Sequence, residues 1–182
     1  IAASEFRING RDVRTLSESG WRTLRGRHVG LVLQDALSSL DPLRTIRQEV
    51  AEVIRTHRLA PRHEVGARVL SSLELVGFPD AAVRADQYPH QLSGGLRQRA
   101  LIASAIAGEP DLLIADEPTT ALDVTVQAQI LDLLAQRRDA GTAVLLISHD
   151  LAVVSRIADR VLVMRDGVLV ESGTTAEVLA AI

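Results

Sequence analysis

The chain has 182 residues, of which 47% are hydrophobic and 24% are charged, and this balance fits a globular domain rather than a disordered tail. All 20 basic residues are arginine, so the chain offers no lysine to grip a phosphate or form a Schiff base. A net charge of -3 argues against nucleic acid as a partner, and the lack of cysteine excludes disulfides and thiolate metal sites.

The first part of the chain predicts a hairpin, a short helix and a strand. Apolar and polar residues alternate before Asn9-Gly10, a pair typical of tight hairpin turns. We expect a brief helix after Ser17. The apolar run 29–33 predicts a buried strand, with Gln34 at its exit.

A helical segment of about forty residues follows, over 45–85. Apolar residues recur there at helix-face spacing across 65–76. The segment Ser93-Gly94-Gly95 then leads into a second helical run over 96–107, with its glycine pair at the start of the helix. These helices together predict a helical subdomain over about 45–107.

The rest of the chain alternates strand and helix, which predicts a parallel sheet with helices on its faces. Two apolar strands are expected at 112–115 and 143–147, with a helix between them. A hairpin is expected over 161–170 at the edge of this sheet. We therefore predict an α/β core over about 110–182.

Polar side chains stand where three of the predicted strands end, namely Gln34, Asp116, Glu117 and His149. In parallel sheets ligands bind at the carboxyl ends of the strands, so we expect these groups to meet at one edge. One carboxylate can hold magnesium through its waters while the other polarises an attacking water, and the amide and imidazole can contact phosphate oxygens. Taken singly, each is better explained as a solvated strand end.

The segment Ser93-Gly94-Gly95 is a second candidate site. Glycines let the backbone approach a ligand closely, and the free N–H groups at a helix start favour a negative charge. The same residue types also serve simply to cap helices.

Five segments resemble motifs of the ATP-binding-cassette (ABC) ATPase family. Leu-Ser-Gly-Gly-Leu-Arg-Gln-Arg at 92–99 resembles the family signature, and Leu-Leu-Ile-Ala-Asp-Glu-Pro at 112–118 resembles its Walker B strand with a catalytic glutamate. Ala121-Leu122-Asp123 is similar to the D-loop, Ser148-His149-Asp150 to the H-loop and Gln34 to the Q-loop glutamine. The likeness covers essentially the whole chain. It implies a truncated P-loop NTPase-like core with an inserted helical subdomain.

The resemblance also implies a role for each matching residue. Asp116 and Gln34 would support magnesium, Glu117 would be the general base, and His149 would contact the terminal phosphate of ATP. Gln34 would also couple the metal and the water to a membrane partner. The signature residues Ser93, Gly94, Gly95 and Gln98 would face a nucleotide bound to an opposite subunit, with Asp123 across that interface.

A finer likeness rests on segments 34–42 and 88–91, which are similar to importer ATPases for dipeptides, oligopeptides, nickel and glutathione. That subfamily usually has proline where this chain has Ala36. The resemblance implies an ATPase subunit that drives import of peptides or a related small solute. Its implied partners are a second ATPase subunit, transmembrane permease subunits and a substrate-binding protein, at the cytoplasmic face of the membrane.

The family's phosphate loop, Gly-x-x-x-x-Gly-Lys-Ser/Thr, is absent from these residues. We therefore expect an internal fragment that is inactive alone, with a natural loss of ATP binding as the alternative. A soluble ABC-type ATPase of DNA repair or translation and a non-catalytic binding module are the rival functions. The first would need basic patches or long coiled-coil insertions, and the second is favoured only by the missing loop.

The histidines other than His149 are His28, His57, His63 and His90. They lack the spacing of metal ligands and have no obvious acidic partner in the sequence. We interpret them as surface or packing residues.

Overall fold

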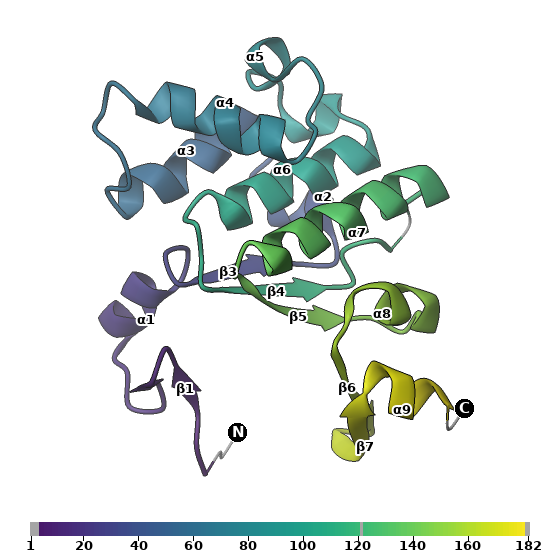
Figure 1. The fold of residues 1–182 in the computed structure, drawn as a ribbon. Helices are drawn as coiled ribbons and strands as arrows, with labels where there is room; N and C mark the ends of the chain where they lie inside the picture. The colour runs from purple at the N-terminus through teal and green to yellow at the C-terminus, as the bar shows by residue number, and fades with distance from the viewer. Residues whose placement is uncertain (1–3, 121, 181–182) are drawn as a thin grey trace.

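The computed structural model describes residues 4–120 and 122–180 and contains both helices and strands (Figure 1). The elements in chain order are β1 (Arg7–Ile8), β2 (Arg11–Asp12), α1 (Glu18–Leu24), β3 (Val29–Val32), α2 (Ala36–Ser39), α3 (Ile46–Thr56), α4 (Val65–Leu75), α5 (Ala81–Arg84), the 3-10 turn η1 (Pro89–Gln91), α6 (Gly94–Ile106), β4 (Leu112–Asp116), α7 (Val124–Asp139), β5 (Ala143–Ile147), α8 (Leu151–Ile157), β6 (Arg160–Arg165), β7 (Val168–Thr174) and α9 (Thr175–Ala180).

The central feature is a three-stranded parallel sheet in the order β3-β4-β5. Val29 of β3 pairs with Leu112 of β4, and Leu112 pairs in turn with Ala143 of β5. Parallel strands need long crossover connections, and here these contain helices. The predicted α/β class with a parallel sheet is confirmed.

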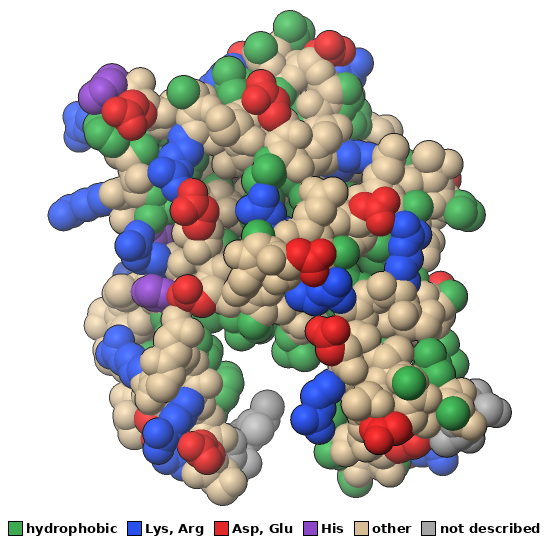
Figure 2. Space-filling view, in the orientation of Figure 1, with side chains coloured by type: hydrophobic (Ala, Val, Ile, Leu, Met, Phe, Trp, Pro, Cys, Tyr) green, Lys and Arg blue, Asp and Glu red, His purple; other side chains and the backbone are tan. Residues whose placement is uncertain are grey.

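Helices α6 and α7 pack on one face of this sheet. In Figure 1, α6 and α7 run side by side over it, and α3, α4 and α5 lie farther out. Along β3 the exposure alternates, because Val32 is fully buried towards the helices whereas Leu31 is 48% exposed on the other face. The prediction of a buried strand is therefore correct for one face of β3 and wrong for the other. Figure 2 shows hydrophobic side chains on the uncovered underside, above the gap between the two end hairpins.

The hairpin near the C-terminus forms as predicted but in a different place. β6 and β7 pair antiparallel around Asp166-Gly167, and they make a two-stranded sheet of their own. The expected position at the edge of the main sheet is wrong. An Asp-Gly turn fixes only local pairing, whereas joining a larger sheet depends on contacts with distant strands.

The helical part of the chain agrees with the predicted segment. α3, α4 and α6 contribute to one continuous hydrophobic core with β3, β4 and α7. Thr45 begins α3 with a capping box in which its side chain and that of Gln48 each accept a backbone N–H. Since α6 packs on both α4 and β3, the division into a subdomain at 45–107 and a core at 110–182 stays a prediction.

Arg99 joins three of these elements. Its guanidinium donates to the carbonyl oxygen of Val76 at 2.5 Å, just after α4, and to that of Gly77 at 3.3 Å. It also donates to the side-chain oxygen of Gln129 on α7. Burial lowers the pKa of Arg99. The side chain therefore ties α4 and α7 to the helix between them.

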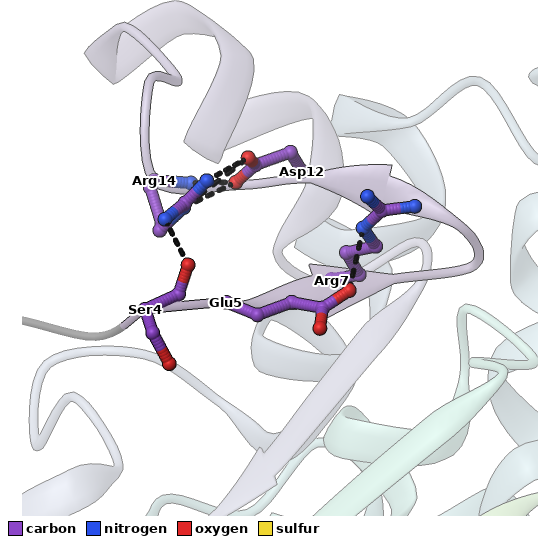
Figure 3. A network of polar contacts seen from close by, with 5 residues as sticks. All are labelled: Ser4, Glu5, Arg7, Asp12 and Arg14. Carbon is purple, nitrogen blue, oxygen red and sulfur yellow. Dashed lines mark hydrogen bonds and ion pairs between the residues drawn. The ribbon is translucent and has the colours of Figure 1, made fainter.

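Two polar clusters organise the N-terminal part. In the hairpin, Arg14 donates to the Asp12 carboxylate and to the Ser4 carbonyl oxygen (Figure 3). The hydrogen bonds that Asp12 accepts from the side chain and the backbone of Arg14 hold its pKa at about 2. At the start of β3, His28 Nδ1 lies 2.7 Å from the Asp111 carboxylate, which also accepts from Asn9 at 2.6 Å. The expectation that His28 lacks an acidic partner is wrong, because the fold brings the starts of β3 and β4 together.

Among the residues described, none of the helices is both long and apolar enough to cross a bilayer. Arginine and acidic side chains are interspersed over the face shown in Figure 2.

Replacing Gly30 by alanine tests the contact between β3 and α6. A Cβ at Gly30 would lie 2.5 Å from the backbone oxygen of Ala105, which cannot move aside as a side chain would. We expect Gly30→Ala to lower the free energy of unfolding by about 1–3 kcal/mol, measured by urea denaturation. The control is Gly66→Ala on α4, where a Cβ meets nothing and should stabilise by up to about 1 kcal/mol. Equal stability of the two variants would contradict the packing described.

Candidate active site at the carboxyl edge of the sheet

Strand register brings the predicted strand-exit residues to one edge. Val32 pairs with Ala115, and Asp116 pairs with Ile147, so Gln34, Glu117 and His149 each follow a paired strand at the same end. Gln34 is exposed, whereas Asp116 and Glu117 are partly buried. The structure therefore assembles the amide, the two carboxylates and the imidazole along a single edge, as the sequence predicts.

Glu117 and His149 are in direct contact. The Oε1 atom of Glu117 lies 2.6 Å from His149 Nδ1 and accepts the backbone N–H of His149 at 3.0 Å. The Glu117 side chain is 15% exposed, whereas that of His149 is 79% exposed. The carboxylate is thus enclosed by the protein, and the imidazole extends from it towards solvent.

The backbone of Glu117 has an unusual conformation. Its φ is 48°, in the left-handed region that residues with a Cβ seldom adopt. Its N–H donates to the carbonyl oxygen of Ile147 at 2.9 Å, which extends the pairing of β4 and β5 by one residue. A non-glycine residue in this region costs on the order of 1 kcal/mol or more, and such strain is typical of functional sites.

Electrostatics keep this pair charged. Burial acts to raise the pKa of the Glu117 carboxyl, but hydrogen bonds from His149 and Thr120 and the charge on His149 together hold that pKa below its usual range. The hydrogen bond to Glu117 and the negative charge of its carboxylate raise the pKa of His149. The arrangement therefore favours a carboxylate next to an imidazolium.

Thr120 is a site residue that the sequence analysis missed. Its hydroxyl donates to Glu117 Oε2 at 2.7 Å, and its backbone N–H donates to the Glu117 carbonyl oxygen at 3.2 Å. These bonds close a turn with Pro118 at its second position, where proline is favoured. The sequence does contain a signal for this contact. A threonine stands three residues after the glutamate, and the proline between them favours a turn that brings the two side chains together.

The signature segment lies at an open helix start. Ser93 caps α6, its hydroxyl accepting the N–H of Leu96 at 3.4 Å. A Cβ placed on Gly94 would meet nothing within 4 Å, so a ligand can approach the backbone there. A Cβ on Gly95 would lie 3.1 Å from the Val126 side chain, which places the start of α6 against the first turn of α7.

Asp123 caps that neighbouring helix. Its carboxylate accepts the N–H of Val126 at 2.9 Å, and the residue is exposed. The predicted D-loop segment also includes Ala121, which lies outside the described residues. The signature segment and Asp123 are therefore close neighbours in the fold.

Gln98 does not share this exposure. Its side chain lies on the buried side of α6, with the residue 4% exposed, and its Nε2 atom has no hydrogen-bond partner within the described part of the chain. The helix turns Gln98 inwards, towards the core that holds Leu101 and Ile102. The geometry therefore argues against the predicted contact of Gln98 with a nucleotide.

The family model for ABC transporters matches residues 2–120, which is more than half of the chain. The chain belongs to this family of ATP-binding cassettes.

Individual relatives carry more specific names. A Brucella ovis protein, provisionally named as a peptide import ATP-binding protein, is 50% identical over 92% of this chain and 50% of its own length. The oligopeptide transport ATP-binding protein OppD of Bacillus subtilis is 45% identical over 96% of this chain and 49% of its own length. The chain thus spans about half the length of these curated relatives.

A solved structure shows the same fold. It is a dimeric, post-hydrolysis state of an ATP-binding cassette bound to ADP and Pi, with a TM-score of 0.83 and 27% identity. The match covers 92% of this chain and 72% of that one. The fold predicted from the sequence motifs is therefore confirmed as that of an ABC ATPase cassette.

The charge pairing at the site can be tested by titrating His149. Removing the negative charge with Glu117→Gln should lower the pKa of His149 towards the ordinary histidine value of about 6.5, so the ring loses its proton at a lower pH than in the wild type. The measurement is NMR of the imidazole resonances against pH.

Asp132→Asn, which removes a carboxylate from the α7 pair with Arg156, is the matched control and should leave the His149 titration unchanged. An identical His149 midpoint in Glu117→Gln and the wild type would rule out the ion pair. In the wild type the pair should be lost as pH rises through the raised pKa of His149, and also as pH falls through the lowered pKa of Glu117.

Proposed function

We propose that this chain is part of the ATP-hydrolysing subunit of an ABC importer for peptides or a related small solute. The observation that carries the proposal is the enclosed Glu117 carboxylate, held by His149 at the carboxyl edge of the parallel sheet. The names of the Brucella ovis and Bacillus subtilis relatives support peptides as the substrate class.

In this proposal Glu117 is the general base for the water that attacks the terminal phosphate of ATP. Glu117 is ionised and acts only as an acceptor, so His149 Nδ1 donates to it. The ring of His149 is exposed, which leaves its Nε2 atom free to donate to a phosphate oxygen. The imidazolium of His149 can thus orient the Glu117 base and also bind the terminal phosphate that the water attacks.

Asp116 and Gln34 are the proposed magnesium residues. They offer a carboxylate and an amide oxygen at the ends of neighbouring strands, and hard oxygen donors suit this ion. The described residues contain no group of three or more His, Cys, Asp or Glu that could hold a metal alone. Magnesium typically binds through one or two protein oxygens, waters and nucleotide phosphates. When bound, it would neutralise charge on the phosphates.

Ser93, Gly94 and Gly95 are proposed to bind the terminal phosphate of a nucleotide held by a second cassette. The open backbone at Gly94 and the start of α6 offer N–H groups and a positive dipole end to an anion. Asp123, beside them at the start of α7, would lie in the same interface. The dimeric state of the matched cassette supports this arrangement.

The chain lacks the phosphate loop, so tight ATP binding is proposed to require sequence beyond these 182 residues. The further partners that we propose are transmembrane permease subunits and a substrate-binding protein. They imply a peripheral position at the cytoplasmic face of the membrane. Exposed Gln34, at the end of β3, is proposed to couple the site to the permease.

The base role predicts the behaviour of Glu117→Gln in the full-length protein. An amide cannot take the proton of the water, so turnover should fall by ~10²- to 10⁴-fold while ATP still binds. Steady-state phosphate release and equilibrium nucleotide binding measure the two effects. The control is Glu171→Gln on β7, the same change on an exposed strand. Turnover of Glu117→Gln within threefold of the wild type would remove Glu117 from the base role.

The interface role predicts the effect of Gly94→Asp. The new side chain has free space within the subunit, but it puts a carboxylate where a phosphate of the other subunit must approach. In the Glu117→Gln background, in which hydrolysis is slow, we expect ATP to bind but no longer to drive dimerisation, as seen by size-exclusion chromatography.

Gly66→Asp makes the same change in open space at the start of α4 and should leave dimerisation intact. An undiminished dimer peak with Gly94→Asp would exclude the signature segment from the interface.

A further inference from the structure

The hydrogen bonds around Glu117 distinguish its two carboxylate oxygens. Oε1 accepts two of them, from the backbone N–H of His149 at 3.0 Å and from His149 Nδ1 at 2.6 Å. Oε2 accepts one, from the Thr120 hydroxyl at 2.7 Å. A carboxylate oxygen has two lone-pair positions, so among the described residues Oε1 is fully engaged and Oε2 keeps one position open.

We infer that Glu117 Oε2 is the atom that takes the proton of the attacking water, and that Thr120 is the positioning residue that aims it. This inference rests on the proposed ATPase function and adds an atom and a residue to it. Thr120 touches neither water nor nucleotide in this assignment. It acts by fixing the rotation of the carboxylate.

The local structure suits Thr120 to that task. Its backbone N–H is bonded to the Glu117 carbonyl oxygen, so the turn holds the hydroxyl at a fixed distance from the carboxylate. The neighbouring Pro118 and Thr119 are buried, which anchors the turn in the protein. His149 holds the other oxygen from the end of β5. The carboxylate is therefore clamped between two separate elements, with one lone pair left to act.

The proposed step is hydrolysis of the terminal phosphate of ATP. The water oxygen forms a bond to the terminal phosphorus while one water proton moves to Glu117 Oε2. The bond between that phosphorus and the bridging oxygen breaks, and the bridging oxygen keeps the electron pair and leaves with ADP. The products are ADP, phosphate and a protonated Glu117, which returns its proton to solvent before the next turnover.

The test is Thr120→Val in the full-length protein, because valine keeps the branched shape but cannot donate. A lost hydrogen bond to a charged group should lower kcat by roughly ten- to a hundredfold, while KM for ATP stays within about twofold. Thr120→Ser retains the hydroxyl and should recover most of the rate. Thr142→Val is the matched control. Thr142 directly precedes the first residue of β5, at the end of the strand away from the site, so this variant should retain wild-type kcat.

The outcomes separate this inference from the proposed function. If Glu117→Gln abolishes turnover but Thr120→Val keeps kcat within threefold of the wild type, the Thr120 assignment is wrong and the ATPase proposal stands. A loss in Thr120→Val that raises KM in parallel, or that serine does not restore, would also overturn it, because a positioning role affects kcat alone. If Glu117→Gln itself keeps full turnover, the base role and this inference fail together.

Discussion

Parallel pairing of β3, β4 and β5 is the constraint on which the site depends. Because all three strands run in the same direction, their carboxyl ends meet at one edge, and residues from three distant parts of the chain are brought together there. The pairing even continues past the end of β4, where the Glu117 N–H bonds to the Ile147 carbonyl oxygen. That bond accompanies the left-handed backbone of Glu117 and sets the direction of its side chain.

The enclosed carboxylate raises a chemical question, because strong hydrogen bonding makes a carboxylate a weaker base. Glu117 accepts three hydrogen bonds and its pKa lies below the usual range, despite burial that acts in the other direction. The protein thus favours a well-oriented base that ionises readily over a more basic but less well-oriented one. Precise placement of a reacting group can contribute more to rate than a modest gain in basicity, since orientation lowers the barrier directly.

Much of this fold could be predicted from local patterns, because they act over short distances. Ser17, Thr45 and Ser93 all cap helices where the sequence indicates helix starts. Properties that depend on distant partners could not be predicted in this way. The exposure of Leu31 depends on which sheet face the helices cover, and the hairpin of β6 and β7 could not be placed from its turn alone. The nucleotide contact of Gln98 was predicted from the motif alone. Its spacing from Leu101 and Ile102 along the helix already placed it on the buried face of α6.

Arg99 has a consequence for how the helices can move. Its guanidinium bonds to acceptors just after α4 and on α7, while its own backbone belongs to α6. Apolar surfaces can slide past one another at little cost, but a half-buried cation that loses its acceptors is left poorly solvated. A rotation of α4 against α7 is therefore resisted at this side chain. These two helices should accordingly turn together with α6, which carries Arg99.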